Sequence, residues 1–234
     1  MFNWYKDKFV TAIITAAGSG RRMGADVNKV FLNLGQRPII DRTIEKIYRS
    51  SYVDHIVLVI RKEDEKKIED VLLSYDRKKF ILVYGGPTRE DSTYRGLMAL
   101  PEETDLVVGH DGARPFITSK KIDQAIETLK DYDGLVFGVA SKDTIKLVGQ
   151  EGIVEKTLDR SCLYNIQTPQ IFKKDILLFA YEEARKKGLK ATDDSGLVEA
   201  YGGQIVLFEG DYSNIKITTI EDLAYGEILL KREL

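Results

Sequence analysis

A glycine- and arginine-rich loop follows the first apolar segment of the chain and has the composition of a phosphate-binding site. Its glycines remove the Cβ atoms that would keep a ligand away from the backbone amides. Arg21 and Arg22 add positive charge, and Lys29 follows a few residues later. Three cations exceed what one diphosphate needs, so we expect the loop to bind a triphosphate. Its candidate nucleotide-binding residues are Ala16, Ala17, Gly18, Ser19, Gly20, Arg22 and Lys29.

The loop matches neither of two familiar phosphate-binding patterns. The P-loop needs a lysine followed by serine or threonine after its last glycine, where this chain has Arg21 and Arg22. The spacing of glycines 18, 20 and 24 is one residue too long for a dinucleotide fingerprint. Taken alone, such a loop is more often a surface connection with two solvated arginines. Lys29 favours the triphosphate interpretation.

Asp111 follows an apolar segment, residues 105–109, that we predict to be a buried strand. In open α/β sheets ligands bind outside the carboxyl ends of the strands, which places the glycine-rich loop at the same edge. A carboxylate facing a triphosphate would repel it unless a divalent cation lay between them, and Mg²⁺ commonly takes one or two carboxylates with phosphate oxygens. We therefore predict that Asp111 binds Mg²⁺. The alternative is an Asx-type turn before Gly112.

Four other residues have two interpretations each. Gly86 and Ser92 follow a further predicted strand, where they would contact a base or ribose, or form a turn and helix cap. Arg114 and Arg160 would clamp phosphates, or form surface ion pairs. Lys216 lies between apolar residues, from which an isolated lysine usually extends to water.

Composition limits the class of protein. The 234 residues contain 35 basic and 37 acidic side chains, so we expect no general binding of nucleic acid. The single cysteine, Cys162, fits a reducing cytoplasm, and neither histidine belongs to a recognisable catalytic relay. We find no signal peptide and no apolar run of membrane-spanning length, so we predict a cytoplasmic protein that does not enter the membrane.

The order of apolar segments predicts an α/β fold with a mainly parallel twisted sheet that helices cover on both faces. We expect one domain spanning residues 1–234. The predicted strands are 10–16, 53–60, 80–84, 105–109, 134–139 and 204–208. The predicted helices are 38–50, 62–74, 89–100, 119–131, 173–187, 193–201 and 219–232.

Residues 141–160 interrupt this alternation with two strand-like segments around a glycine-rich turn. A protruding β-arm and a simple hairpin at the sheet edge explain the pattern equally well. An arm with an apolar side needs a covering surface, and a second copy of the chain would supply one. We therefore predict a homodimer formed through the arm.

Together, these motifs resemble the 2-C-methyl-D-erythritol 4-phosphate cytidylyltransferase family, in order from about residue 10 to residue 230. The first loop is common to many sugar-phosphate nucleotidyltransferases, whereas the segments at 110–115 and 143–146 are more specific. The motifs are A-A-G-x-G-x-R-M at 16–23, Lys29, H-D-G-A-R-P at 110–115, D-T-x-K at 143–146, D-R at 159–160, T-P-Q at 168–170 and N-I-K at 214–216.

The resemblance implies a Rossmann-like nucleotidyltransferase fold and the transfer of CMP from CTP to methylerythritol phosphate, a sugar-alcohol phosphate, with release of diphosphate. It implies that Arg22 and Lys29 stabilise the transition state, that Asp111 binds Mg²⁺, and that Arg160 and Lys216 position the attacking phosphate. The residues at the acceptor site would be Arg114, Thr144, Arg160, Thr168, Thr192 and Lys216.

Two positions depart from the family pattern. Pro87 stands where many members carry an acidic residue, so a base contact from that side chain is lost, and Ser213 replaces a common aspartate. One rival function is that of a ribitol 5-phosphate cytidylyltransferase, whose members usually have two glycines where this chain has Ala16 and Ala17. The other is a nucleotide-binding module without catalysis.

Overall fold

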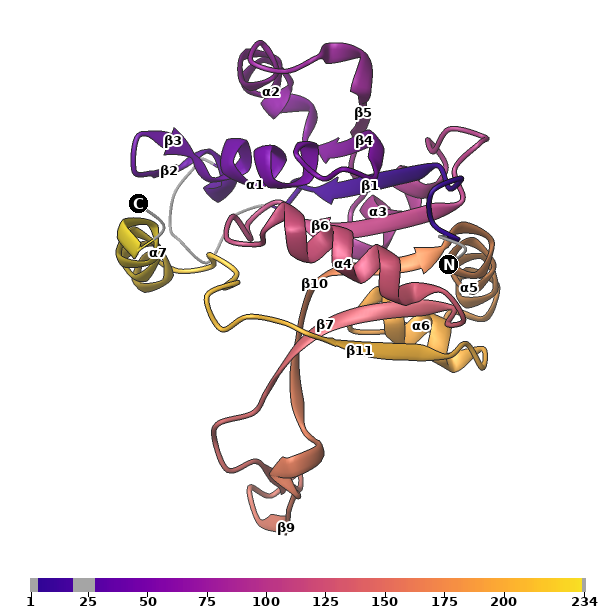
Figure 1. Ribbon diagram of the computed structural model, residues 1–234. Helices are drawn as coiled ribbons and strands as arrows, with labels where there is room; N and C mark the ends of the chain where they lie inside the picture. The colour runs from indigo at the N-terminus through magenta and orange to yellow at the C-terminus, as the bar shows by residue number, and fades with distance from the viewer. Residues whose placement is uncertain (1–3, 19–27, 233–234) are drawn as a thin grey trace.

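A computed structural model describes residues 4–18 and 28–232 of the chain (Figure 1). A seven-stranded sheet forms its centre, in the order β11-β7-β10-β6-β1-β4-β5. Its strands are β1 (Val10–Thr15), β4 (Val53–Ile60), β5 (Phe80–Tyr84), β6 (Leu106–Asp111), β7 (Gly134–Ala140), β10 (Tyr164–Lys173) and β11 (Ile205–Glu209).

Helices cover both faces of this sheet, which confirms the predicted fold class (Figure 1). One layer contains α1 (Ile39–Tyr48), α2 (Glu65–Leu72) and α4 (Ser119–Leu129). The opposite layer contains α3 (Arg89–Leu97), α5 (Lys174–Lys187) and α6 (Asp194–Ala200). Successive β1 residues point to opposite layers: Ile14 packs with the first and Ile13 with the second. The central strands are continuously apolar because both of their faces are buried.

The last helix, α7 (Ile220–Arg232), packs outside these two layers. Its Leu229 lies in a small cluster with Leu34 and Ile217. Leu34 belongs to a short ribbon, β2 (Asn33–Leu34) and β3 (Arg37–Pro38), that precedes α1. This packing brings the C-terminal part of the chain beside the segment that follows the glycine-rich loop.

Strand β10 is the main element that the sequence did not predict. It pairs antiparallel with both β6 and β7, whereas the other strand pairs of the sheet are parallel. Gln167, Thr168 and Gln170 make its centre polar, although all three are buried. This composition lacks the apolar pattern of a central strand, and hydrogen bonds to neighbouring loops compensate for it.

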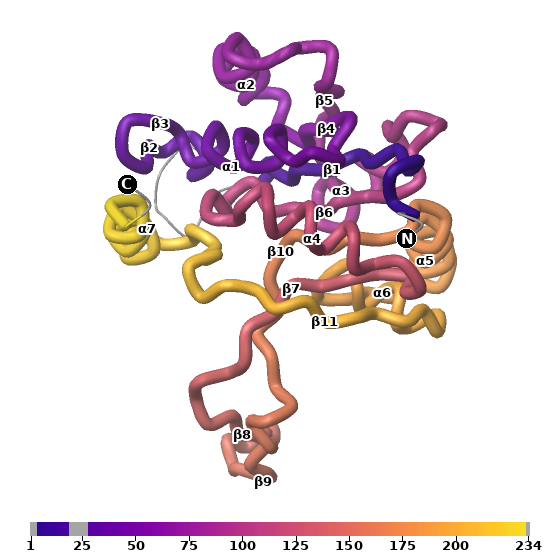
Figure 2. The backbone as a smooth tube through the Cα atoms, viewed as in Figure 1, coloured from indigo at the N-terminus to yellow at the C-terminus, as the bar shows by residue number. Residues whose placement is uncertain are grey.

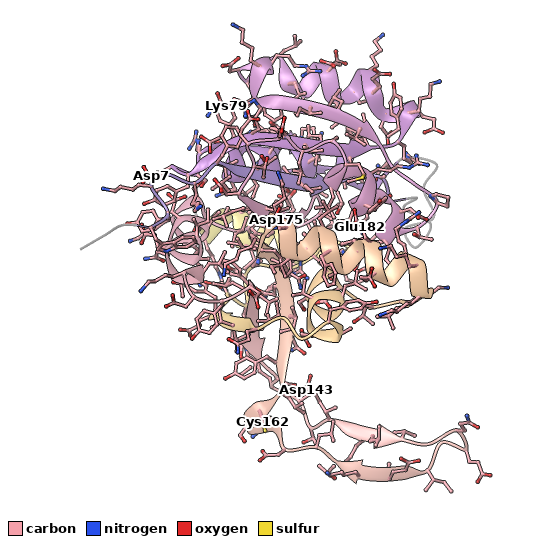
Figure 3. All side chains as sticks on the ribbon, turned by 90° about the vertical axis from the view of Figure 1, so that its right-hand side faces the viewer. Asp7, Lys79, Asp143, Cys162, Asp175 and Glu182 are labelled. Carbon is pink, nitrogen blue, oxygen red and sulfur yellow. The ribbon has the colours of Figure 1, made fainter. Side chains whose placement is uncertain are left out.

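Residues 141–160 form the predicted protruding arm rather than an edge hairpin. Strands β8 (Lys146–Val148) and β9 (Val154–Thr157) pair only with each other. β7 and β10 lead side by side into the arm, which extends away from the helices (Figures 1 and 2). Figure 3 shows Asp143 and Cys162 where the arm leaves the body. Within the described residues, no helix combines the length and apolar composition of a membrane span.

Candidate active site

A cavity of about 440 Å³ opens at the carboxyl ends of β1, β5 and β6. Five separate parts of the chain meet there: the end of β1, the short 3-10 helix η2 (Lys29–Phe31), the turn into α3, the end of β6 with the segment after it, and the segment before α7. Its lining residues are Thr15, Ala16, Ala17, Gly18, Asn28, Lys29, Val30, Gly86, Pro87, Thr88, Arg89, Ser92, Asp111, Ala113, Lys216 and Thr218.

Lys29, Asp111 and Lys216 therefore lie at one cavity, although they are far apart in the sequence. The sequence predicted a strand at 105–109 with Asp111 beyond its end. In the structure, Asp111 is instead the last residue of β6. Ser19, Gly20 and Arg22, also predicted for this site, lie outside the described residues.

The Asp111 carboxylate forms the electrostatic centre of the cavity. Its Oδ2 atom lies 2.9 Å from Lys216 Nζ and 3.4 Å from Arg114 Nε. Burial by itself would raise the pKa of Asp111, but the charges of Lys216 and Arg114 outweigh it and lower the pKa to about 2. The carboxylate therefore remains ionised at neutral pH.

Thr168 and His110 form a hydrogen-bonded chain that holds the backbone of Asp111 in place. His110 Nε2 lies 3.0 Å from the carbonyl oxygen of Arg114, so this nitrogen carries the proton and donates. Burial lowers the pKa of His110 to about 4, so the ring is neutral. The Thr168 hydroxyl accepts from the Asp111 N–H at 3.0 Å and donates to His110 Nδ1 at 3.0 Å. Thr168 thus fixes Asp111 rather than lining the cavity.

Arg89 is a third cation in the cavity lining, after Lys29 and Lys216, and the sequence did not predict it. Its two terminal nitrogens lie 3.1 and 3.2 Å from the two Asp194 oxygens, and the Tyr181 hydroxyl donates to Asp194 at 2.6 Å. Burial opposes the charge of Arg89, but Asp194 and Asp111 raise its pKa above the ordinary value. Its position three residues after the glycine pair at 85–86, which follows a strand, was the available sequence signal.

The turn before α3 also lines the cavity. Ser92 Oγ accepts from the Gly86 N–H at 3.0 Å and donates to the Thr88 carbonyl at 2.9 Å, so its hydroxyl shapes the turn. A Cβ atom on Gly86 would overlap the Cβ of Asp91. Pro87 lines the cavity beside them, without a polar side-chain group for a ligand.

The remaining predicted acceptor residues do not line the cavity in the described part of the chain. The largely buried Arg114 donates instead to the Asn214 carbonyl at 2.8 Å. Thr144 and Arg160 are exposed on the arm, where Arg160 donates to the Lys142 carbonyl at 3.0 Å. Thr192 is exposed before α6. One chain therefore does not bring the arm residues and the cavity together.

The cavity lining fits a divalent cation whose remaining ligands come from a bound substrate. Among the described residues, Asp111 is the only carboxylate in the lining, and no cluster of three metal-binding side chains occurs. Mg²⁺ characteristically combines one or two carboxylates with phosphate oxygens and water, so a single carboxylate suffices once a nucleotide supplies the rest.

Comparisons with known proteins agree with this geometry. Residues 10–232 match the family model described as 2-C-methyl-D-erythritol 4-phosphate cytidylyltransferase. The protein of that name from Clostridium novyi is 43% identical, and the alignment covers 94% of this chain and 96% of that protein. The protein of that name from Clostridioides difficile is also 43% identical, and the alignment covers 95% of this chain and 94% of that protein.

A solved structure is also similar to this chain over its whole length. The 4-diphosphocytidyl-2C-methyl-D-erythritol synthase of Anaerococcus prevotii superposes with a TM-score of 0.90 at 39% identity, covering 99% of this chain and 100% of that one. The Francisella tularensis 2-C-methyl-D-erythritol 4-phosphate cytidylyltransferase superposes with a TM-score of 0.80 at 30% identity, covering 94% of this chain and 99% of that one.

Proposed function

The chain belongs to the 2-C-methyl-D-erythritol 4-phosphate cytidylyltransferase family, and on that premise we propose that it transfers CMP from CTP to 2-C-methyl-D-erythritol 4-phosphate. The products are 4-diphosphocytidyl-2-C-methyl-D-erythritol and diphosphate, and the reaction belongs to non-mevalonate isoprenoid biosynthesis. The single cysteine suits a cytoplasmic enzyme.

The observation that carries this proposal is the charge arrangement at the cavity. Lys29, Arg89 and Lys216 line the same cavity as the ionised Asp111. Such a set attracts a polyphosphate and places a carboxylate where a cation could bridge it to the phosphates. A module that bound only a nucleoside would not need this combination.

The chemistry requires positioning and charge stabilisation more than covalent help from the protein. A phosphate monoester is largely a dianion near neutral pH, so its oxygen attacks the α-phosphorus of CTP without a general base. Charge then develops on the departing diphosphate. Lys29, together with Arg22, stabilises that charge, while Lys216 holds the attacking phosphate. The neutral His110 supports Asp111 and takes no part in proton transfer.

We propose Asp111 as the residue that holds Mg²⁺, which when bound neutralises charge between the carboxylate and the phosphates. The 2.9 Å pair of Asp111 and Lys216 suggests how the acceptor binds. With the carboxylate of Asp111 holding the cation, the ammonium of Lys216 beside it would hold the incoming phosphate.

The acceptor site is completed, in this proposal, by the arm of a second copy. Thr144 and Arg160 are exposed on the arm and lie away from their own cavity, so they are placed to reach a partner. Four apolar side chains on the arm are also 48–65% exposed, and an interface between copies would bury them: Leu147, Val148, Ile153 and Val154. We therefore propose a homodimer with composite sites.

A diphosphate-release assay tests this function against its rivals. Purified protein is incubated with CTP and Mg²⁺ and with methylerythritol phosphate, ribitol 5-phosphate or no acceptor. We expect release that depends on methylerythritol phosphate. Preference for ribitol 5-phosphate would support the rival enzyme, and CTP binding without release would support the non-catalytic module.

A further inference from the structure

Asn28, the residue before Lys29, is almost completely buried beside the cavity, with 1% of its surface exposed. Its Nδ2 atom donates to the Ala16 carbonyl at 2.8 Å and to Asp64 Oδ2 at 2.9 Å. Both amide protons are therefore used, and the orientation of the amide follows from its two acceptors. Nothing in the sequence reasoning had singled out this residue.

Asp64 is itself fixed by an arginine. Arg61 Nε lies 2.7 Å from Asp64 Oδ2, and Arg61 Nη2 lies 3.1 Å from Oδ1. Only 4% of the Asp64 side chain is exposed, so the carboxylate is buried, paired and hydrogen-bonded. Arg61 directly follows β4. The network thus connects the ends of two neighbouring strands, β1 and β4, to the segment containing Asn28.

The same residue starts the short helix that carries Lys29. Asn28 Oδ1 accepts from the Val30 N–H at 3.4 Å, and the Asn28 carbonyl accepts from the Phe31 N–H at 3.0 Å. Val30 is buried with 3% exposed. Both neighbours of Lys29 are therefore anchored, which restricts where its Cα atom lies relative to the end of β1.

We propose that Asn28 is a positioning residue that sets Lys29 against the transferring phosphates, with Asp64 and Arg61 holding its amide in place. This inference rests on the proposed role of Lys29. An amide suits the task because one nitrogen donates to two acceptors while the oxygen accepts a third bond. Neither aspartate, which lacks donors when ionised, nor serine, which has one, could replace it.

The expected effect is kinetic. A displacement of about 1 Å at a charge-stabilising group can cost on the order of a hundredfold in rate. We therefore expect Asn28→Ala to lower kcat by about tenfold to a hundredfold while changing KM for CTP by less than about threefold.

A double-mutant cycle with Lys29→Ala separates positioning from a general loss of structure. If Asn28 acts through Lys29, adding Asn28→Ala to Lys29→Ala lowers kcat by less than about twofold further. The control is Thr11→Val, which breaks a buried 2.8 Å hydroxyl pair with Thr104 near the other end of β1. It should lower the thermal midpoint and leave kcat unchanged.

Equal losses from Asn28→Ala in both backgrounds, or full kcat in Asn28→Ala alone, would overturn the inference. Should Asn28→Ala unfold at the assay temperature, Asp64→Asn replaces it, because it keeps an oxygen acceptor but removes the charge that pairs with Arg61. We expect it to lower kcat severalfold only when Lys29 is present, and an unchanged kcat overturns the inference. Failure of the unmodified protein to release diphosphate would instead refute the proposed function.

Discussion

Replacing Asp111 by asparagine tests the electrostatic design of the cavity. The substitution preserves the shape of the side chain but removes the charge that lies 2.9 Å from Lys216 Nζ and 3.4 Å from Arg114 Nε. Arg114 is largely buried, with 13% of its side chain exposed, so its guanidinium would lose a nearby counter-charge in a poorly solvated position. We therefore expect the folded protein to become less stable at neutral pH.

The magnitude follows from the pKa of the carboxyl group. Its fall from the ordinary 3.8 to about 2 corresponds to about 2.5 kcal/mol of unfolding free energy, at 1.36 kcal/mol per pKa unit. Because the folded pKa lies below the unfolded one, this stabilisation is complete above about pH 5 and is lost as the pH falls through the folded value. About half of it remains at pH 3.

Urea unfolding in metal-free buffer, measured from pH 7 to pH 3, provides the assay. Asp111→Asn should be about 2.5 kcal/mol less stable than the unmodified protein at pH 7, and the difference should halve by pH 3. The control is Glu69→Gln, which removes a half-exposed pair with Arg77 and should change stability by less than about 1 kcal/mol. A difference near zero at pH 7, or one independent of pH, would refute the reasoning.

Three further outcomes concern activity. Lys29→Ala should lower the rate of diphosphate release by roughly 10²–10³, as loss of an oxyanion-stabilising group does, and near-normal turnover would exclude that role. Gly86→Ala should raise KM for CTP about tenfold, because the new Cβ overlaps that of Asp91, and unchanged kinetics would exclude a nucleotide contact at this turn. Mixing Arg160→Ala protein with Lys29→Ala protein should restore part of the activity, since a mixed dimer holds one intact composite site. Inactive mixtures with demonstrated heterodimers would contradict arm exchange.

The sequence predicted the fold well where burial alone determines residue type. Strands such as Val53–Ile60 are continuously apolar because helices cover both faces, so pattern and structure agree. β10 was missed because its centre consists of Gln167, Thr168 and Gln170. Their amides and hydroxyl bind specific groups elsewhere in the chain, for example the Asp111 N–H at the end of β6, and such long-range partners leave no periodic signal.

The candidate site was predictable to the extent that residue type and strand ends identify it. Asp111 and Lys29 stand directly beside recognisable segments, and the cavity contains both. The sequence predicted no structural role for Asn28 or His110, because their importance comes from partners distant in the sequence, such as Asp64 and Thr168. A side chain that positions another one is visible only when the partner's coordinates are known.

The position of β10 explains how one strand serves two distant parts of the proposed site. Near its middle, Thr168 fixes the backbone of Asp111, and its first residues pair with the end of β7 as the two strands leave the sheet toward the arm (Figure 2). Tyr164 faces Ala140 at that point, so the base of the arm continues the ladder of the central sheet. The arm is therefore fixed to the same strand that orients the carboxylate. If arms are exchanged between copies, as we propose, each central sheet orients its own Asp111 and also the arm that contacts the other copy.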